Sequence, residues 1–342
     1  MKPALGALKK RLGLLSAALA AAGRPLAFME VCGTHTMAVF RSGLASLLPA
    51  GLRLISGPGC PVCVTSQGDI DALIALADIP GAMVCTYGAM VRVPGSRGSL
   101  ERSRGMGASV HVVYSSLDAV RLASENPGRP VIFAAIGFET TAPATAAAVE
   151  QAQARKLSNF SVFVSPKTVL PALPALLAPG HSRLDGFLLP GHVSVIIGSD
   201  AYLPIVERYQ VPCVISGFED AHLVEAILML AELARDRKAA LGNVYPQVVT
   251  AGGNKAALAL IDKVFETGDA HWRGLGPLPG SALVLRKEYQ PFDARRRYEL
   301  PDTQVPEPPG CRCGEVILGR VTPPECGLFR VKCTPTNPIG PC

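Results

Sequence analysis

Short apolar segments recur along the first 235 residues, with spacings of roughly 25–30 residues that suit one strand–helix unit each. Most are apolar at consecutive positions rather than at alternating ones, which is typical of parallel strands covered on both faces. Stretches rich in Ala and Leu follow most of them. The pattern predicts doubly wound parallel α/β sheets. The predicted strands are 26–31, 52–56, 82–86, 110–114, 131–136, 161–165, 186–189 and 211–215.

The regular pattern changes at two points along the chain. An Asn-Pro-Gly turn at 126–128 predicts a break between two sheets. After about residue 235 the pattern ends; a helix-like stretch (254–267), a Gly- and Pro-rich stretch (274–280) and a Pro- and Cys-rich tail (306–342) follow. The sequence predicts four parts: an N-terminal helix (1–24), two α/β domains (25–127 and 128–235) and a small cysteine-rich domain (236–342).

The N-terminal segment has two interpretations. Basic residues 9–11 followed by an apolar run to Ala22 resemble a signal peptide. We predict an amphipathic helix instead, because leucines recur on one helical face. The run is too short to span a bilayer, and no later segment is long and apolar enough to do so, which predicts a protein with no membrane segment. The leucines are Leu5, Leu8, Leu12, Leu15 and Leu19.

Composition and charge exclude two further classes. The chain has 342 residues, which favours two or three domains. The chain has 49% hydrophobic and 18% charged residues, a composition typical of a folded protein with a buried core and not of a disordered protein. The net charge is +6, but the single basic run, Arg295–Arg297, is too short to indicate nucleic-acid binding.

Ten cysteines, five of them after residue 310, make metal or redox chemistry the main expectation for an intracellular chain of this length. The tail has too few large apolar residues to fold by burial alone, so we expect its cysteines to bind a stabilising group. An iron–sulfur cluster is held by thiolates from irregular backbone, whereas zinc prefers more regular spacing, so the unequal gaps favour iron–sulfur. The tail cysteines are Cys311, Cys313, Cys326, Cys333 and Cys342.

Residues that suit a binding site gather directly after the predicted strands. Ligands of open parallel sheets bind beyond the carboxyl ends of the strands. Gly, Cys, His, Thr and Glu are concentrated there, which predicts a cleft along that edge. The loops are 32–35, 57–63, 87–88, 137–141, 190–192 and 217–220.

Cys60 and Cys63 form a CxxC motif at a strand-to-helix turn. Two thiols at this spacing can close a disulfide, and N–H groups at a helix start lower a thiol pKa. Half of a zinc site is the alternative, although no second cysteine or histidine pair follows at finger-like spacing. We therefore predict redox or ligand chemistry.

Cys32 ends a strand and is followed by Gly33, Thr34 and His35. A lone cysteine at a strand end is often only a small core residue. Here glycine permits close approach to the backbone, a thiolate suits low-spin iron, and the imidazole can exchange a proton.

Four other candidates have more ordinary interpretations. Cys85 and Cys213 lie inside apolar strands and are predicted to be core residues. For His192 and for Glu139, which precedes two threonines, a place at a helix start is as good an explanation as catalysis.

Five motifs in order along the chain resemble the HypD family of [NiFe]-hydrogenase expression/formation proteins. The resemblance implies two α/β domains and a domain holding a [4Fe–4S] cluster. It implies a HypC-type chaperone as partner, a HypE-type cyanide donor, an Fe(CN)₂CO group as cargo, and a cytoplasmic location. The motifs are Cys-Gly-Thr-His (32–35), Gly-Pro-Gly-Cys-Pro-Val-Cys-Val-Thr (57–65), Gly-Phe-Glu-Thr-Thr-Ala-Pro (137–143), Pro-Gly-His-Val-Ser (190–194) and Cys-Thr-Pro (333–335).

The same resemblance implies roles for single residues. Cys32 would hold the iron fragment, Thr34 and His35 would line its site, and Cys60 and Cys63 would form a redox pair that passes electrons from the cluster. The fourth cluster ligand stays open between Cys342, Cys313 and a cysteine beyond Cys342. The other three cluster ligands would be Cys311, Cys326 and Cys333.

Three functions are compatible with these residues. The first is an assembly scaffold with redox activity rather than a turnover enzyme. The second is a free-standing thiol–disulfide oxidoreductase of the iron–sulfur type, and the third is a structural zinc protein. Only the first uses Cys32, the CxxC motif and the cysteine-rich tail together.

Overall fold

The computed structural model describes residues 2–178, 183–301 and 305–341, and all eight predicted strands are present with small shifts at their ends. Their continuous apolar character is explained by burial, since every residue of the central strand over 131–137 is buried. The strands are β1 (Leu26–Glu30), β2 (Leu52–Ser56), β3 (Met83–Thr86), β4 (Ser109–Val112), β5 (Val131–Gly137), β6 (Phe160–Pro166), β7 (Gly186–Pro190) and β8 (Cys213–Ser216).

The helices begin at residues that satisfy free backbone N–H groups. Ser66 caps α4 by accepting from Asp69 N–H, and Ser115 and Asp118 form a capping box at α6. The α-helices are α1 (Lys2–Ala22), α2 (Gly33–Arg41), α3 (Pro61–Val64), α4 (Gln67–Ala77), α5 (Leu100–Gly105), α6 (Ser116–Glu125), α7 (Ala142–Ala154), α8 (Ala172–Leu176), α9 (Gly191–Ile197), α10 (Leu203–Tyr209), α11 (Asp220–Arg235), α12 (Lys255–Val264), α13 (Ala294–Arg297) and α14 (Cys313–Ile317). The 3₁₀ turns are η1 (Leu44–Ser46), η2 (Gly88–Met90), η3 (Asp200–Tyr202), η4 (Lys287–Phe292) and η5 (Pro323–Glu325).

Two parallel sheets form the fold, which confirms the predicted α/β class. One has the order β2-β1-β7-β8-β9, with β9 at Leu241–Asn243, and the other has the order β4-β3-β5-β6. The predicted position of the break at 126–128 is wrong, because β3 and β4 before that turn pair into one sheet with β5 and β6 after it. The chain leaves the first sheet after β2 and returns to it at β7.

A β-hairpin after residue 264 is absent from the prediction. Strand β10 (Phe265–Trp272) pairs antiparallel with β11 (Gly276–Leu285), so the stretch 274–280 is largely strand. Its glycines and prolines, and the polar residues of β10, hide the strand pattern. Lys167, just after β6, bridges to Ala282 of β11, so the hairpin lies next to the end of the second sheet.

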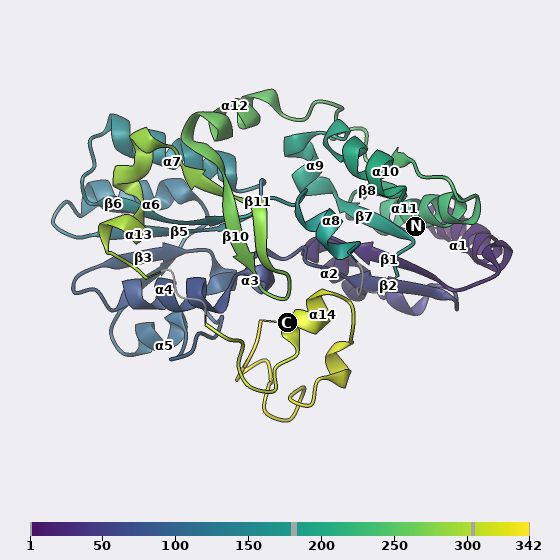
Figure 1. The fold of residues 1–342 in the computed structure, drawn as a ribbon, viewed down its shortest axis with the longest axis horizontal. Coiled ribbons are helices and arrows are strands. Elements are labelled where there is room, and N and C mark those ends of the chain that lie inside the picture. Colours follow the sequence, from purple (N-terminus) through teal and green to yellow (C-terminus); the bar gives the residue numbers. More distant parts are fainter. Residues whose placement is uncertain (1, 179–182, 302–304, 342) are drawn as a thin grey trace. The chain divides into compact units, whose positions relative to one another are not determined.

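The chain folds into two compact units that are interleaved along the sequence. The first comprises residues up to Cys60, Ala172–Lys255 and Val316–Arg320; the second comprises Pro61–Pro171, Ala256–Glu315 and the chain from Val321 onward. Each has its own apolar core. In the second unit, α6 and α7 cover one face of the sheet and α4 the other (Figure 1).

The N-terminal helix packs as predicted. Leu15 and Leu19 of α1 are buried against α11, where Leu223 and Leu230 share the same core. The side chains of Leu5 and Leu8 lie outside the described residues. Across the described parts of the chain, no helix has the length and apolar character needed to cross a membrane.

Candidate functional site

The predicted site residues of the first unit meet at one edge of its sheet. Strands β1 and β2 run parallel with Glu30 opposite Ser56, so the loops carrying Cys32 and Cys60 leave the sheet side by side. The ends of β7 and β8 contribute His192 and Phe218 to the same edge. In this unit the loops predicted to carry function therefore gather at the carboxyl ends of parallel strands.

Three glycines allow the Cys32 and Cys60 loops to approach each other closely. Gly57 N–H donates to Glu30 O (2.8 Å) and Gly33 N–H donates to Gly59 O (3.0 Å), so the backbones of the two loops are in direct contact. A Cβ on Gly59 would overlap the backbone nitrogen of Cys32. A Cβ on Gly33 would lie 3.3 Å from Cys60 Cβ. Cys60 is thus held against the turn that carries Cys32.

Cys32 occupies the N-cap position of α2 and is almost completely buried. Burial raises the pKa of its thiol, while the backbone N–H groups of His35 and Thr34 and the Thr34 hydroxyl oppose that rise by hydrogen bonding to the thiolate. The predicted neighbours Thr34 and His35 therefore both act on this sulfur. Because the pKa lies above its ordinary value, the proton stays on the thiol near neutral pH.

His35 is a neutral imidazole with one fixed tautomer. Burial lowers its pKa to about 4. Its Nε2 lies 3.2 Å from Ser216 O, and because a carbonyl only accepts, Nε2 carries the proton and Nδ1 the lone pair. The ring packs 5.1 Å from Phe218, on which His192 also stacks at 4.0 Å. Among the residues that the structure describes, Nδ1 has no hydrogen-bond partner.

The CxxC motif lies where the sequence predicts it, between β2 and a helix. Cys60 directly precedes α3, and Cys63 lies within that four-residue helix. Cys60 belongs to the first unit and Cys63 to the second. The Cys63 thiol reaches Pro341 O at 3.5 Å, so the end of the described tail lies beside the second cysteine of the motif.

Three thiols of the tail surround one short segment, 339–341. A Cβ on Gly340 would overlap Cys313 Sγ and lie 2.8 Å from Cys311 Sγ. Cys333 Sγ accepts the N–H of Ile339 at 3.2 Å. A hydrogen bond from Cys313 lowers the pKa of Cys311 to about 6. The segment thus gathers three thiols, and of these Cys311 has thiolate character.

The remaining tail cysteines are less closely placed. Cys326 is buried. Its sulfur lies 4.0 Å from the carbonyl oxygen of Gly310, the residue before Cys311. Cys342 lies outside the described residues. Within 2–178, 183–301 and 305–341, no three His, Cys, Asp or Glu side chains are arranged to hold a single metal ion.

Comparisons with known proteins give matches over nearly the whole chain. The family model HypD, described as the hydrogenase formation hypA family, matches residues 9–342. The chain belongs to the HypD family. The hydrogenase maturation factor HypD of Azotobacter vinelandii is 47% identical over 344 residues, covering 98% of this chain and 91% of that protein. The factor of the same name from Escherichia coli K12 is 44% identical over 320 residues, covering 93% and 86%.

Sequence reasoning missed a buried acid in the HypD-family site. Glu30, at the end of β1, accepts the Thr36 hydroxyl at 2.6 Å, and Thr36 also contacts the Ser56 hydroxyl at 2.6 Å. Burial raises the pKa of Glu30 to about 7. A glutamate in an otherwise apolar strand was the available signal, and it links β1, α2 and β2 beneath Cys32.

The core predictions are confirmed for both strand cysteines. Cys85 and Cys213 are fully buried in β3 and β8, and burial raises the pKa of each thiol to about 12. His192 is the second residue of α9. Glu139 is buried, accepts the Val169 N–H at 2.8 Å, and burial raises its pKa to about 7.

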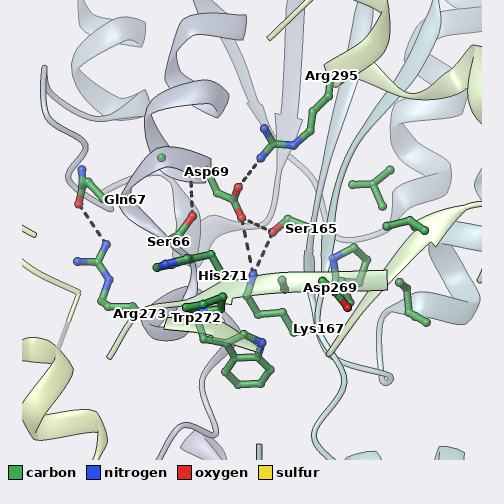
Figure 2. Close-up of a pocket in the computed structure, with 18 of the residues that line it drawn as sticks. Ser66, Gln67, Asp69, Ser165, Lys167, Asp269, His271, Trp272, Arg273 and Arg295 are labelled. Carbon is green, nitrogen blue, oxygen red and sulfur yellow. Dashed lines mark hydrogen bonds and ion pairs between the residues drawn. The ribbon is translucent and has the colours of Figure 1, made fainter. Parts of the chain in front are cut away.

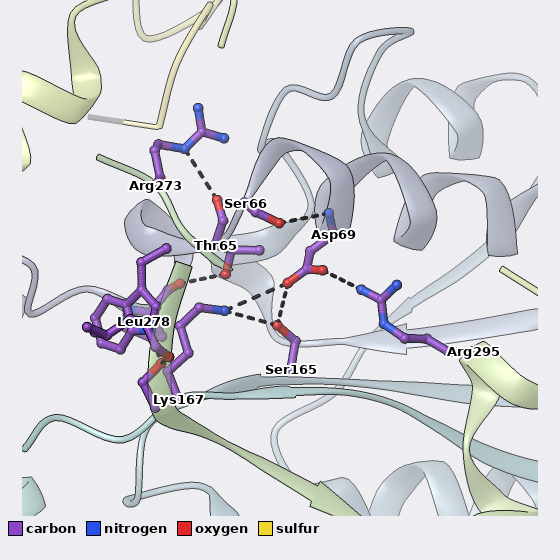
Figure 3. A network of polar contacts seen from close by, with 11 residues as sticks. Thr65, Ser66, Asp69, Ser165, Lys167, Arg273, Leu278 and Arg295 are labelled. Carbon is purple, nitrogen blue, oxygen red and sulfur yellow. Dashed lines mark hydrogen bonds and ion pairs between the residues drawn. The ribbon is translucent and has the colours of Figure 1, made fainter. Parts of the chain in front are cut away.

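A cavity of about 890 Å³ in the second unit was also not predicted. It lies between the start of α4, the end of β6 and the hairpin (Figure 2). Asp69 is the centre of its polar network: it lies 3.8 Å from Lys167 Nζ, accepts the Ser165 hydroxyl at 2.9 Å and pairs with Arg295 (Figure 3). The buried Lys167 therefore has a counter-charge, and the network joins α4, β6 and α13.

We predict that Gly59→Ala separates the Cys32 and Cys60 loops, because the added methyl overlaps the backbone of Cys32. The free energy of unfolding should fall by about 1–3 kcal/mol, as expected for overpacking. Alkylation of Cys32 by iodoacetamide, followed by mass spectrometry, should become faster. Gly13→Ala is the control, because a Cβ there meets nothing within 4 Å. Wild-type stability and Cys32 reactivity in Gly59→Ala would contradict this arrangement.

Proposed function

We propose that this chain is a hydrogenase maturation factor that assembles and carries the Fe(CN)₂CO group of [NiFe]-hydrogenase in the cytoplasm. It would act as a scaffold with redox activity, together with a HypC-type chaperone and a HypE-type cyanide donor. The HypD relatives, named as hydrogenase maturation factors, support the general role. The observation that carries the finer proposal is the Cys32 thiol, buried at the start of α2 and held against Cys60.

Cys32 supplies the soft ligand for the iron cargo. Its thiol is shielded from water, and donors from Thr34 and His35 favour the negatively charged form. A thiolate suits low-spin iron better than oxygen ligands do. Iron binding would displace the proton, since metal affinity at a thiol is coupled to its deprotonation.

His35 offers a hydrogen-bond acceptor that carries no charge. Because its pKa is lowered to about 4, the ring is neutral throughout the physiological range, and Ser216 fixes the Nε2–H tautomer. The lone pair on Nδ1 is therefore available to accept a hydrogen bond. This suits a site that would hold cyanide-bearing iron without an added positive charge.

Cys60 and Cys63 would act as a dithiol/disulfide couple. Reduction of a disulfide between them takes up two electrons and two protons and yields two thiols. The position of Cys60 beside the Cys32 turn favours delivery to the iron cargo, and the contact of Cys63 with Pro341 favours supply from the tail.

The tail suits a [4Fe–4S] group, which supplies one-electron transfer when bound. The thiols of Cys311, Cys313 and Cys333 lie around 339–341, in irregular backbone of the kind that holds such clusters. Cys311, Cys326 and Cys333 would be ligands. The fourth ligand is open between Cys313, Cys342 and a residue beyond.

A surface next to Cys32 suits the chaperone. Three large apolar side chains, two on α2 and one directly after η1, are exposed: Met37 by 48%, Phe40 by 70% and Leu47 by 54%. Met37 and Phe40 are three residues apart and so share one face of α2. Exposed apolar residues gathered beside a functional loop mark interaction surfaces. A free-standing oxidoreductase would need neither this surface nor Cys32.

Cys32→Ala should abolish binding of the iron cargo while leaving the fold intact. Infrared spectroscopy of the complex with the HypC-type partner should show bands of metal-bound CO and cyanide for the wild type and none for the variant. Cys213→Ala is the matched control, since it removes a buried thiol from the same sheet; it should cost about 1 kcal/mol of stability and keep the bands. Bands that survive Cys32→Ala would rule out Cys32 as the anchor.

Anaerobically purified protein should contain about four iron and four acid-labile sulfide per chain, as for ferredoxin-type ligation. Cys326→Ala and Cys333→Ala should each lose both, whereas Cys85→Ala, in the core of β3, should retain them. Iron, sulfide and zinc analysis of the four proteins tests this. Stoichiometric zinc without sulfide would show a structural zinc protein instead.

Phe40→Ser should weaken binding of the HypC-type partner at least about tenfold, as expected for an aromatic anchor at an interface. Isothermal titration calorimetry provides the affinities. Tyr114→Ser is the control, because Tyr114 is a 95% exposed aromatic residue distant in sequence. Equal affinities for Phe40→Ser and the wild type would remove this surface from the proposal.

A further inference from the structure

Arg273 is a buried arginine with no role in the proposed function. It follows the last residue of β10 and is only 3% exposed. Its backbone N–H donates to Val64 O at 2.9 Å and its Nε to Thr65 O at 3.3 Å (Figure 3). Val64 ends α3, the short helix that carries Cys63. Arg273 therefore binds the backbone directly behind the CxxC motif.

The charge of Arg273 lacks a compensating acid in these contacts. Its Nη2 donates to the neutral amide oxygen of Gln67 at 3.1 Å (Figure 2), and the acceptors on Val64 and Thr65 are carbonyls. In the described part of the chain, the buried Nη1 has no hydrogen-bond acceptor. Burial of an unpaired charge is costly, so a nearby negative group is expected. The contrast is Lys167, whose charge is matched by Asp69.

The first tail cysteines are candidates for that negative group. A Cβ on Gly274, the residue after Arg273, would lie 2.8 Å from Gly314 O, so the two backbones touch next to Cys313. Arg273 is also close enough to Cys311 for its charge to act on that sulfur, as does the opposite charge of Glu307. Arg273 thus connects the segment after Cys63 with the segment that carries Cys311 and Cys313.

We propose that Arg273 is a positioning residue for electron transfer, holding the Cys63 helix against the tail while its buried charge raises the reduction potential of the tail cluster. The inference rests on the proposed function. Reduction adds one electron, and hence one negative charge, to the cluster. A fixed positive charge in a poorly solvated site stabilises this reduced form more than the oxidised form.

The test is an anaerobic redox titration of the purified full chain, followed by the electron paramagnetic resonance signal of the reduced cluster. Arg273→Gln removes the charge but keeps a planar donor, and should lower the ratio of reduced to oxidised cluster at least tenfold at a given potential, about 59 mV for one electron. Arg273→Lys keeps the charge and should stay closer to the wild type. Arg286→Gln, at a partly exposed arginine after β11, should not change the potential.

Each outcome decides the inference. If the wild-type protein contains no iron or sulfide and gives no electron paramagnetic resonance signal, the cluster assignment of the proposed function is wrong. The role of Arg273 is then wrong as well. A wild-type signal with the same potential in Arg273→Gln overturns only the role of Arg273. If Arg273→Gln loses the cluster, Arg273→Lys decides: retention at the wild-type potential supports the role of the charge, and loss there too shows a purely structural contact.

Discussion

The close approach of two backbones at the carboxyl ends of β1 and β2 is the constraint on which the Cys32 site depends. The strands pair in parallel from Leu26 opposite Leu52 to Glu30 opposite Ser56, so both end at the same edge of the sheet, next to each other. Gly57 and Gly59 then allow the second loop to lie on the first without side chains between them. A residue with a Cβ at Gly59 would separate the loops. The loops that carry the Cys32 and Cys60 thiols can thus lie in contact because Gly59 has no Cβ.

The same edge is organised to keep charge low around Cys32. Burial favours the protonated form of Glu30 and the neutral form of His35 near physiological pH. Both residues are fixed by hydrogen bonds, to Thr36 and to Ser216 O. A thiolate that binds iron there would be the principal charge of the site, and its partners are backbone N–H groups at the start of α2. Dipoles that are already oriented stabilise such a charge without reorganisation.

The tail follows a different physical principle from the two sheets. The sheets are held by burial, as the fully buried β5 and the apolar residues around α4 and α11 show. The tail has few large buried apolar residues, and its short elements α14 and η5 lie between cysteines. Its thiols instead gather around 339–341. Under the proposed function, such a segment would gain its stability from the group that the thiols bind.

The sequence by itself determined eight of the nine strands that the described residues contribute to the two parallel sheets, and the residues that follow those eight. A strand covered on both faces must be continuously apolar, so 131–136 was recognisable without a structure. Cys32 was recognisable because it follows such a strand, and the CxxC motif was recognisable by the spacing of its two cysteines. The chemistry of the tail was indicated by five cysteines in a stretch that lacks a core.

Only the tertiary structure decided which strands are neighbours and which charges are buried. The apolar composition of a strand indicates that both of its faces are covered, but it does not identify the neighbouring strands. The sequence therefore could not predict that the chain returns to the first sheet at β7. The hairpin β10–β11 was hidden because its glycines and prolines resemble a loop. Nothing local distinguishes Arg273 or Lys167 from surface residues: their burial comes from packing of distant segments, since a side chain's exposure depends on what lies against it.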